Sequence, residues 1–319
     1  MKYKVLIPQA ISKEGVELLE SHGYEVIMGS GITEENLVKD VIDCDAILLR
    51  TAPCTKAVLE AGKRLKIVAR HGAGYNNVDI QTASELGIWV TNSPDSTTNT
   101  VAEFTLGAIL TISKKIVLMN KEMKKGNFFF KTNNKGIDLS GKKLGIVGFG
   151  RIGRRVAYKA YHGLDMEILA YSPSATKENS PEYVTVCDWD TIFKESDIIS
   201  LHMPYTENNA GCVGAKEFNN MKSSAYFINC ARGEVVNEKA LISALKSGKI
   251  AGAFIDVFEV EPPNINNPLL SMDNVVVTPH MASNTEECMM LMATQAASEI
   301  VRVLTGEIPN WPVNMPINK

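Results

Sequence analysis

The chain has 319 residues, 45% of them hydrophobic and 22% charged, with a formal net charge of −3. This length allows two domains, and the composition is typical of a soluble globular protein. The small negative charge argues against nucleic acid or an anionic membrane surface as a partner.

The six cysteines of the chain include no CxxC pair. Their spacing favours neither a metal site nor a disulfide framework, so we expect reduced thiols and no bound metal. The apolar run over 4–8 soon meets polar residues and is too short for a signal peptide core or a membrane span. These features predict a cytoplasmic protein.

Short apolar runs alternate with helical patterns in the first hundred residues. Strands are predicted over 4–8, 24–28, 46–50, 65–70 and 88–92. The helical stretches over 12–23 and 78–87 each end at a glycine suited to a helix C-cap. Continuous apolar strands separated by helices predict an α/β domain, with a parallel sheet covered on both faces.

A long helical pattern follows, from about Thr98 to Met123, and is apolar on much of its circumference. Such a helix should be covered on several sides, and we expect a second subunit of a homodimer to supply part of the cover. The α/β alternation then resumes, with strands predicted over 143–149, 167–172, 183–188, 197–203, 225–231, 251–258 and 274–280. A helix fits 237–248, with Asn237 as its N-cap, and the chain is helical again after Pro279.

Gly148, Gly150 and Gly153 have G-x-G-x-x-G spacing, directly after a predicted strand and before a helical pattern. The first glycine permits a tight turn, the second lets the backbone approach a pyrophosphate, and the third lets the helix pack on the strand. The helix N-terminus adds unpaired N–H groups for the phosphates. The pattern predicts a dinucleotide site, although glycine-rich turns also occur in purely structural loops.

In a dinucleotide-binding domain the second strand usually ends in an acid that binds the adenosine ribose of NAD. Ser172 stands at that place here. A serine does not repel a 2′-phosphate, and Ser174 and Lys177 could contact one. No arginine follows immediately, so the cofactor is predicted to be NAD or NADP, with the preference open.

Six stretches resemble the D-2-hydroxyacid dehydrogenase family, in order along nearly the whole chain. They are RHGAGYNNVD (70–79), TNTVAE (98–103), GFGRIG (148–153), NCARGEVVNEKAL (229–241), AGAFIDVFEVEPP (251–263) and VVVTPHMAS (275–283). The resemblance implies a Rossmann nucleotide-binding domain over 99–284, inserted in a flavodoxin-like α/β substrate domain made of 1–98 and 285–319. An inserted domain explains why the glycine turn comes so late in the chain.

The same resemblance implies an oxidoreductase that exchanges a hydride between NAD(P) and C2 of a D-2-hydroxy acid. Histidine suits the accompanying proton transfer because it titrates near neutral pH. His280 lies at the end of a predicted strand, and its position alone would favour a purely structural role. Its match to the TPH motif of the family implies that it is the acid/base. By resemblance, Glu261 is its carboxylate partner and Arg232 binds the substrate carboxylate. Without the resemblance, these two would be a loop acid and a surface ion pair.

The resemblance also implies binding residues. The implied cofactor contacts are Thr100, Gly148, Gly150, Arg151, Ile152, Gly153, Ser172, His202, Pro204, Thr206, Cys230, Ala231 and Asp256. Asp256 would hold the nicotinamide carboxamide, or simply cap a loop after its strand. Ala73 and Gly74 would bind the substrate carboxylate through backbone N–H groups, together with Arg232 and His280. Arg50 would bind a second anionic group of the substrate, or pair with a local acid.

Two functions remain open at this point. One is an NAD(P)-dependent D-2-hydroxyacid dehydrogenase, such as a D-3-phosphoglycerate dehydrogenase or a glyoxylate/hydroxypyruvate reductase. The other is a dinucleotide-sensing, corepressor-like binding protein of the same fold. A formate dehydrogenase is disfavoured, because that relative calls for glutamine where Glu261 stands.

Overall fold

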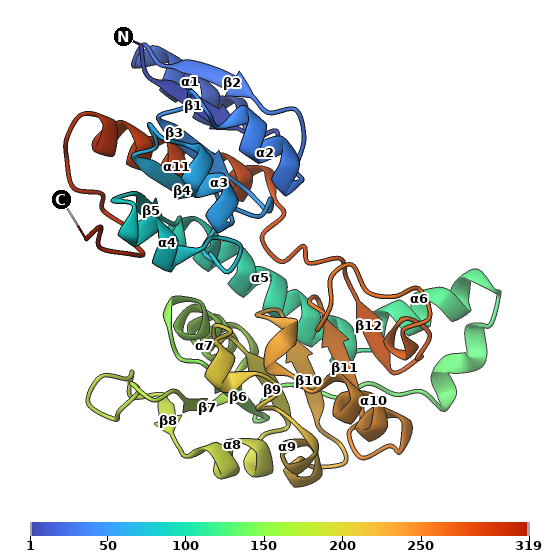
Figure 1. Cartoon of the computed structure of the whole chain (residues 1–319). Helices are drawn as coiled ribbons and strands as arrows, with labels where there is room; N and C mark the ends of the chain where they lie inside the picture. Colours follow the sequence, from blue (N-terminus) through green and yellow to red (C-terminus); the bar gives the residue numbers. More distant parts are fainter. Residues whose placement is uncertain (1, 318–319) are drawn as a thin grey trace. The chain divides into compact units, whose positions relative to one another are not determined.

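A computed structural model describes residues 2–317. The chain divides into two compact units, which are distinguished by colour along the sequence in Figure 1. Unit 1 comprises the described residues of Met1–Thr97 and Ser283–Lys319, and unit 2 comprises Thr98–Ala282. Unit 2 is therefore an insertion within the chain of unit 1. No helix within residues 2–317 is long and apolar enough to cross a membrane.

Unit 1 contains a five-stranded parallel sheet. Its strands are β1 (Lys4–Ile7), β2 (Glu25–Met28), β3 (Ala46–Leu49), β4 (Ile67–Arg70) and β5 (Trp89–Thr91), in the spatial order β2-β1-β3-β4-β5. This is the flavodoxin-like order, in which the direction of winding reverses between β1 and β3. The predicted strands, their parallel pairing and the flavodoxin-like fold are confirmed.

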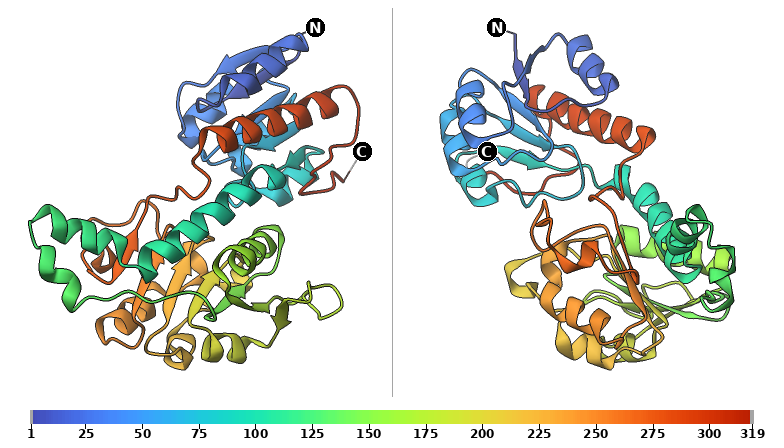
Figure 2. Two further views of the ribbon diagram at one scale, coloured as in Figure 1. Left: turned by 180° about the vertical axis from the view of Figure 1, so that it is seen from behind. Right: turned by 90° about the vertical axis from the view of Figure 1, so that its right-hand side faces the viewer.

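Helices cover both faces of the sheet in unit 1 (Figure 2). On one face lie α1 (Lys13–Ser21) and α11 (Glu286–Leu304), and on the other lie α2 (Glu34–Asp40), α3 (Lys56–Ala61) and α4 (Ile80–Glu85). Alternate strand residues point to opposite faces, so Val5 and Ile7 join one core cluster and Leu6 the other. The C-terminal segment lies along the edge strand β5, through an antiparallel bridge between Thr91 and Pro312.

Unit 2 contains a seven-stranded parallel sheet. Its strands are β6 (Lys143–Val147), β7 (Glu167–Tyr171), β8 (Val184–Val186), β9 (Ile198–Leu201), β10 (Tyr226–Asn229), β11 (Gly252–Ile255) and β12 (Val275–Val277), in the order β12-β11-β10-β9-β6-β7-β8. The chain winds outward from β6 in one direction and then returns to continue from β9 in the other. This Rossmann arrangement was predicted, and it puts a topological switch point between β6 and β9.

Helices also cover both faces of the sheet in unit 2. One core cluster involves α5 (Pro94–Ser113) and α7 (Arg151–Leu164), and the other involves α8 (Trp189–Glu195), α9 (Ala215–Asn220) and α10 (Glu238–Lys246). The Asn237 side chain accepts a hydrogen bond from the Ala240 N–H, which confirms the predicted N-cap of α10. Short 3₁₀ turns occur at Phe128–Thr132, Glu207–Asn209, Gly233–Val235 and Pro268–Leu270.

The single helix expected over 98–123 is wrong. The helix α5 ends at Ser113, and a second helix, α6 (Ile116–Lys124), begins after Lys115, whose φ of 54° is left-handed. The Ser113 carbonyl accepts a hydrogen bond from the Ile137 N–H, so that a later segment of the chain binds the end of α5. Ile109 is fully buried in the core of unit 2. Part of the apolar circumference is therefore covered by the chain itself.

Candidate active site

The glycine turn between β6 and α7 leaves room only for glycine at its first position. Gly148 has a φ of 98°, and a Cβ there would lie 2.5 Å from the backbone carbon of His202 and the nitrogen of Met203. A Cβ on Gly153 would overlap the carbonyl oxygen of Gly148, so the helix touches the turn directly. No atom lies within 4 Å of the Cβ position at Gly150. The space beside Gly150 is open, as a bound pyrophosphate requires.

Backbone hydrogen bonds fix this turn at the switch point of the sheet. The Gly148 N–H donates to the Tyr171 carbonyl at 2.8 Å, and the His202 N–H donates to the Val147 carbonyl at 2.7 Å. The carboxyl ends of β6, β7 and β9 are thereby joined. Ligands of open α/β sheets bind at this position, where the N-terminus of α7 also points its N–H groups outward. The residues present fit a dinucleotide.

The other predicted cofactor residues of unit 2 follow neighbouring strands, except Thr100, which lies on α5. Ser172 follows β7; His202, Pro204 and Thr206 follow β9; Cys230 and Ala231 follow β10; Asp256 follows β11; Arg151 and Ile152 begin α7. Because every strand is parallel, all these strand ends lie at one edge of the sheet. Their contacts with a cofactor stay a prediction.

Several of these residues have hydrogen-bond partners in the protein, among them His202 and Thr206. The Ser200 hydroxyl lies 2.9 Å from Nε2 of His202, and burial lowers the pKa of His202 to about 4. This imidazole is therefore neutral at pH 7. Thr206 caps the following 3₁₀ turn, and its N–H donates to the Asn209 side chain at 2.7 Å. Both interactions hold the loop after β9, which lies beside the glycine turn.

The fully buried Asp256 holds the loop that carries His280. Its carboxylate accepts a hydrogen bond from the Thr278 hydroxyl. It also accepts the N–H groups of Met281 and Ala282, both at 2.9 Å. Its carbonyl accepts the His280 N–H at 2.7 Å. Four hydrogen bonds thus shape a turn in which His280 has a φ of 50°. A non-glycine residue in this region is strained and persists only when its surroundings fix it.

His280 and Glu261 form the central pair of the site. Nδ1 of His280 lies 2.7 Å from Oε2 of Glu261, and the other oxygen, Oε1, accepts the Phe258 N–H at 3.1 Å. An ionised carboxylate only accepts hydrogen bonds, so Nδ1 carries the hydrogen. In the neutral ring Nε2 is then free to accept a proton. The His280 side chain is 48% exposed.

The environment of Glu261 keeps this carboxylate ionised. Burial acts to raise its pKa, but the hydrogen bond and charge of His280, the Phe258 N–H and the charge of Arg232 outweigh burial and lower it. Arg232 is half-buried, and burial lowers the pKa of its guanidinium while Glu234 and Glu261 oppose that shift. Arg232, Glu261 and His280 therefore interact electrostatically within unit 2, although their catalytic roles stay predictions.

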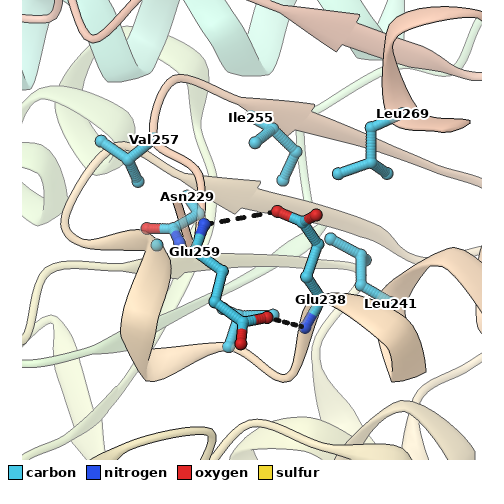
Figure 3. Close-up of a pocket in the computed structure, with 9 residues that line it drawn as sticks. Asn229, Glu238, Leu241, Ile255, Val257, Glu259 and Leu269 are labelled. Atoms are coloured by element: carbon cyan, nitrogen blue, oxygen red, sulfur yellow. Dashed lines mark hydrogen bonds between the residues drawn. The ribbon is translucent and has the colours of Figure 1, made fainter. Parts of the chain in front are cut away.

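Backbone contact between two segments positions Arg232 and Glu261. A Cβ on Gly233 would overlap the backbone carbonyl of Phe258, so these segments touch through a position that only glycine can occupy. The carboxylates of Glu238 and Glu259 each accept the other's backbone N–H, as the dashed lines in Figure 3 show. The pocket beside this pair has a volume of about 10 Å³, which leaves no room for a metabolite. Its role is structural.

The predicted substrate residues of unit 1 lie on loops after β3 and β4. Arg50 follows β3 and donates to the Ala10 carbonyl at 2.7 Å, without an ion pair within the described residues. Ala73 and Gly74 follow β4. Asn77 connects the two loops, because its Nδ2 donates to the Arg50 and Ala52 carbonyls at 3.1 and 2.7 Å. The alternative, a pairing of Arg50 with a local acid, is not seen within the described residues, and its anion contact stays a prediction.

Residues 106–282 match the family described as D-isomer specific 2-hydroxyacid dehydrogenase, NAD binding domain. The chain belongs to this family. The resemblance recognised in the sequence is confirmed, and the matched dehydrogenase domain contains the glycine turn and the His280–Glu261 pair.

Individual relatives span the whole of the chain. It is 38% identical over 315 residues to a D-3-phosphoglycerate dehydrogenase of Archaeoglobus fulgidus, covering 98% of this chain and 59% of that protein. It is 38% identical over 307 residues to a hydroxypyruvate reductase of Thermotoga maritima, covering 95% and 99%. The chain thus spans about three fifths of the length of the first relative.

A solved structure gives the same result for the fold. An NADPH-dependent glyoxylate/hydroxypyruvate reductase of Sinorhizobium meliloti, in complex with NADP and malonate, aligns with a TM-score of 0.89 at 26% identity. The alignment covers 99% of this chain and 98% of that one. These relatives are 2-hydroxyacid dehydrogenases or reductases by name, and the corepressor-like alternative is not favoured.

Sequence reasoning about this dehydrogenase family member missed several supporting residues. Asn229 is buried; its side chain donates to the Arg232 carbonyl and accepts the Ala231 N–H, and so shapes the turn that presents Arg232. An asparagine at the end of a buried strand is a recognisable signal for such a turn. Asn77 and Gly233 also support the site, but their partners are distant in sequence, so that no local pattern predicts them.

Proposed function

We propose that the protein is a cytoplasmic, NAD(P)-dependent dehydrogenase that interconverts a D-2-hydroxy acid and its 2-oxo acid. The observation that carries the proposal is the 2.7 Å contact between His280 and Glu261, at the carboxyl edge of a Rossmann sheet. The six free thiols support a reducing compartment. Family membership supports the reaction class.

His280 moves the proton in the proposed reaction. The nicotinamide, when bound, exchanges a hydride with C2 of the substrate. With Nδ1–H held by Glu261, Nε2 accepts the hydroxyl proton during oxidation and returns it to the carbonyl oxygen during reduction. The ionised Glu261 stabilises the imidazolium that forms. The hydrogen bonds that Asp256 accepts hold the backbone of the turn that carries His280.

Arg232 supplies positive charge for the oxygens of the substrate. Its guanidinium donates one hydrogen bond to the Ala231 carbonyl at 2.7 Å. The planar group has further N–H donors, which match a carboxylate in two-pronged geometry. From the family resemblance, we propose that Ala73 and Gly74 bind a substrate carboxylate through their N–H groups. Arg50 would take a second anionic group in a phosphorylated substrate such as 3-phosphohydroxypyruvate.

We propose that the protein forms a homodimer. No residue of α6 is buried, and five apolar side chains of α6 and the following 3₁₀ turn are exposed by about half or more, whereas Leu118, Met119 and Phe130 are partly buried. The five exposed side chains are Ile116 (50%), Val117 (47%), Met123 (56%), Phe128 (53%) and Phe129 (78%). Monomers rarely expose such a continuous apolar segment, and a second copy of the chain would cover it.

Turnover assays test the proposal. The protein is mixed with NADH or NADPH and with one 2-oxo acid at a time: glyoxylate, hydroxypyruvate, pyruvate or 3-phosphohydroxypyruvate. The loss of reduced-nicotinamide absorbance is followed. In the reverse direction, D-hydroxy acids are expected to react and their L-enantiomers are the control. Dinucleotide binding without turnover of any 2-oxo acid would favour the corepressor-like alternative.

A further inference from the structure

We infer that this protein has a subsite for the 2′-phosphate of NADP, formed by Arg154, Ser172 and Ser174, and that it prefers NADPH to NADH. The inference rests on the proposed function, because the subsite belongs to the same dinucleotide site. Sequence order alone left the preference open, since no arginine directly follows β7.

The structure brings an arginine to this place from a different element. Arg154 lies in α7, and its guanidinium carbon is 4.5 Å from the centre of the Phe149 ring. Its Nη1 donates to the carbonyl of Asn179 at 2.9 Å. Asn179 belongs to the loop after β7, and this loop begins at Ser172. The guanidinium therefore extends along the glycine turn to the loop where the adenosine ribose is bound in this fold.

The Asn179 side chain cross-links this loop by hydrogen bonds to two other loop residues. Its Oδ1 accepts the Thr176 N–H at 2.9 Å, and its Nδ2 donates to the Ser174 carbonyl at 2.8 Å. The hydroxyls of Ser172 and Ser174 are 3.4 Å apart. A single asparagine thus connects Arg154 with the backbone of Ser174, whose hydroxyl lies close to that of Ser172. Hydroxyl and guanidinium groups are the donors that bind phosphate oxygens best.

The charge at this loop favours a dianion. The usual ribose-binding acid is absent, because Ser172 is neutral. Within the described residues, Arg154 has no ion pair, and its guanidinium donates one hydrogen bond, to the Asn179 carbonyl. Lys177 adds a second exposed cation. The loop contains two acids, Glu178 and Glu182, which are both exposed, and Glu178 is engaged with its own backbone and with Thr176. An arginine near the ribose is the usual means of accepting a 2′-phosphate.

Binding experiments without turnover test the inference. Dissociation constants of NADPH and NADH are measured by fluorescence titration, and those of 2′,5′-ADP and 5′-AMP by calorimetry. The unmodified protein is expected to bind NADPH and 2′,5′-ADP at least about tenfold more tightly than NADH and 5′-AMP, the range of a charge-assisted hydrogen bond. Arg154→Gln should remove most of this difference and change NADH binding less than about twofold.

A matched variant separates the subsite from general electrostatics. Arg155 is the next residue of α7, but its guanidinium contacts the Asn99 side chain and the Tyr158 ring. Arg155→Gln removes the same charge and should leave the NADPH preference unchanged. Ser172→Asp should reverse the preference, because a carboxylate binds a ribose diol and repels a 2′-phosphate. If Arg154→Gln fails to fold, Arg154→Lys keeps the charge and should retain part of the preference.

The possible outcomes are distinct. Tighter binding of NADH by the unmodified protein, or an equal loss of both cofactors in Arg154→Gln, would overturn the subsite and leave the proposed dehydrogenase untouched. Failure of both NADPH and NADH to bind would instead refute the proposed function. Selective NADPH binding without turnover would support the subsite and refute the dehydrogenase.

Discussion

Nδ1 of His280 lies 2.7 Å from Oε2 of Glu261, and this contact divides the two nitrogens of the ring between two tasks. Nδ1 is held by the carboxylate, and Nε2 is left for the proton. His280→Ala is therefore expected to lower kcat by about 10²–10⁴-fold, the usual contribution of general acid–base catalysis. Cofactor dissociation constants should change little. Full turnover in this variant would contradict the acid/base assignment.

Glu261→Gln should change the pH dependence of the reaction. The amide cannot stabilise an imidazolium as a carboxylate does, and reduction of a 2-oxo acid needs the imidazolium. The alkaline limb of the pH–rate profile is therefore expected to move to lower pH, by about one unit or more. The profile of kcat/KM for both proteins is the measurement, and superimposable profiles would remove Glu261 from the mechanism.

The low pKa of Glu261 also affects stability. A carboxylate whose pKa is depressed in the folded state stabilises the protein above its unfolded pKa, near 4.3, and this stabilisation is lost as the pH falls through the folded value. Glu261→Gln should accordingly show a smaller decrease in the free energy of unfolding than the unmodified protein when the pH is lowered from about 5 to 3. Urea titrations at each pH measure it, and parallel decreases would argue against a paired carboxylate.

Gly233→Ala should destabilise the protein and displace the Arg232 segment. The added methyl group would overlap backbone atoms of Phe258, which cannot move aside as the end of a flexible side chain could. Overpacking of this kind costs about 1–3 kcal/mol. Gly163→Ala is the control: no atom lies within 4 Å of that Cβ position in α7, and alanine favours a helix. Equal stabilities of the two variants would contradict the close backbone contact.

Phe129→Glu should dissociate the proposed homodimer without unfolding the subunit, because Phe129 is 78% exposed in the single chain. Light scattering is expected to give about twice 34.9 kDa for the unmodified protein and the monomer mass for the variant. Ile109→Glu is a poor probe of assembly, since Ile109 is buried within unit 2 and its replacement would disrupt the core. A monomeric unmodified protein at micromolar concentration would refute the dimer.

Local patterns in the sequence were sufficient for elements whose cause is local. The strands of both sheets read as continuous apolar runs because parallel sheets are buried on both faces, and Asn237 could be placed because its partner is three residues away. The ends of the strands were placed too far out, since apolar residues such as Val257 continue into the loops.

Features that depend on distant contacts could not be predicted in the same way. The end of α5 is set by a hydrogen bond from Ile137 to Ser113, and the position of Arg154 by a carbonyl 25 residues later. His280 and Glu261 were paired only because a family resemblance connected them. Composition and periodicity contain no information about which loop reaches which strand end.

The insertion of unit 2 has a consequence for synthesis on the ribosome. The five strands of unit 1 are complete by Thr91, but α11, which covers one face of their sheet, begins only at Glu286. At about 5–20 residues per second, the intervening chain takes roughly 10–40 s to make. Throughout this interval the apolar face formed by Val5, Ile7 and Leu48 lacks its final cover, whereas all strands of unit 2 emerge in one continuous stretch. We expect the inserted unit to complete its fold first, and chaperone binding to nascent chains to persist until α11 emerges.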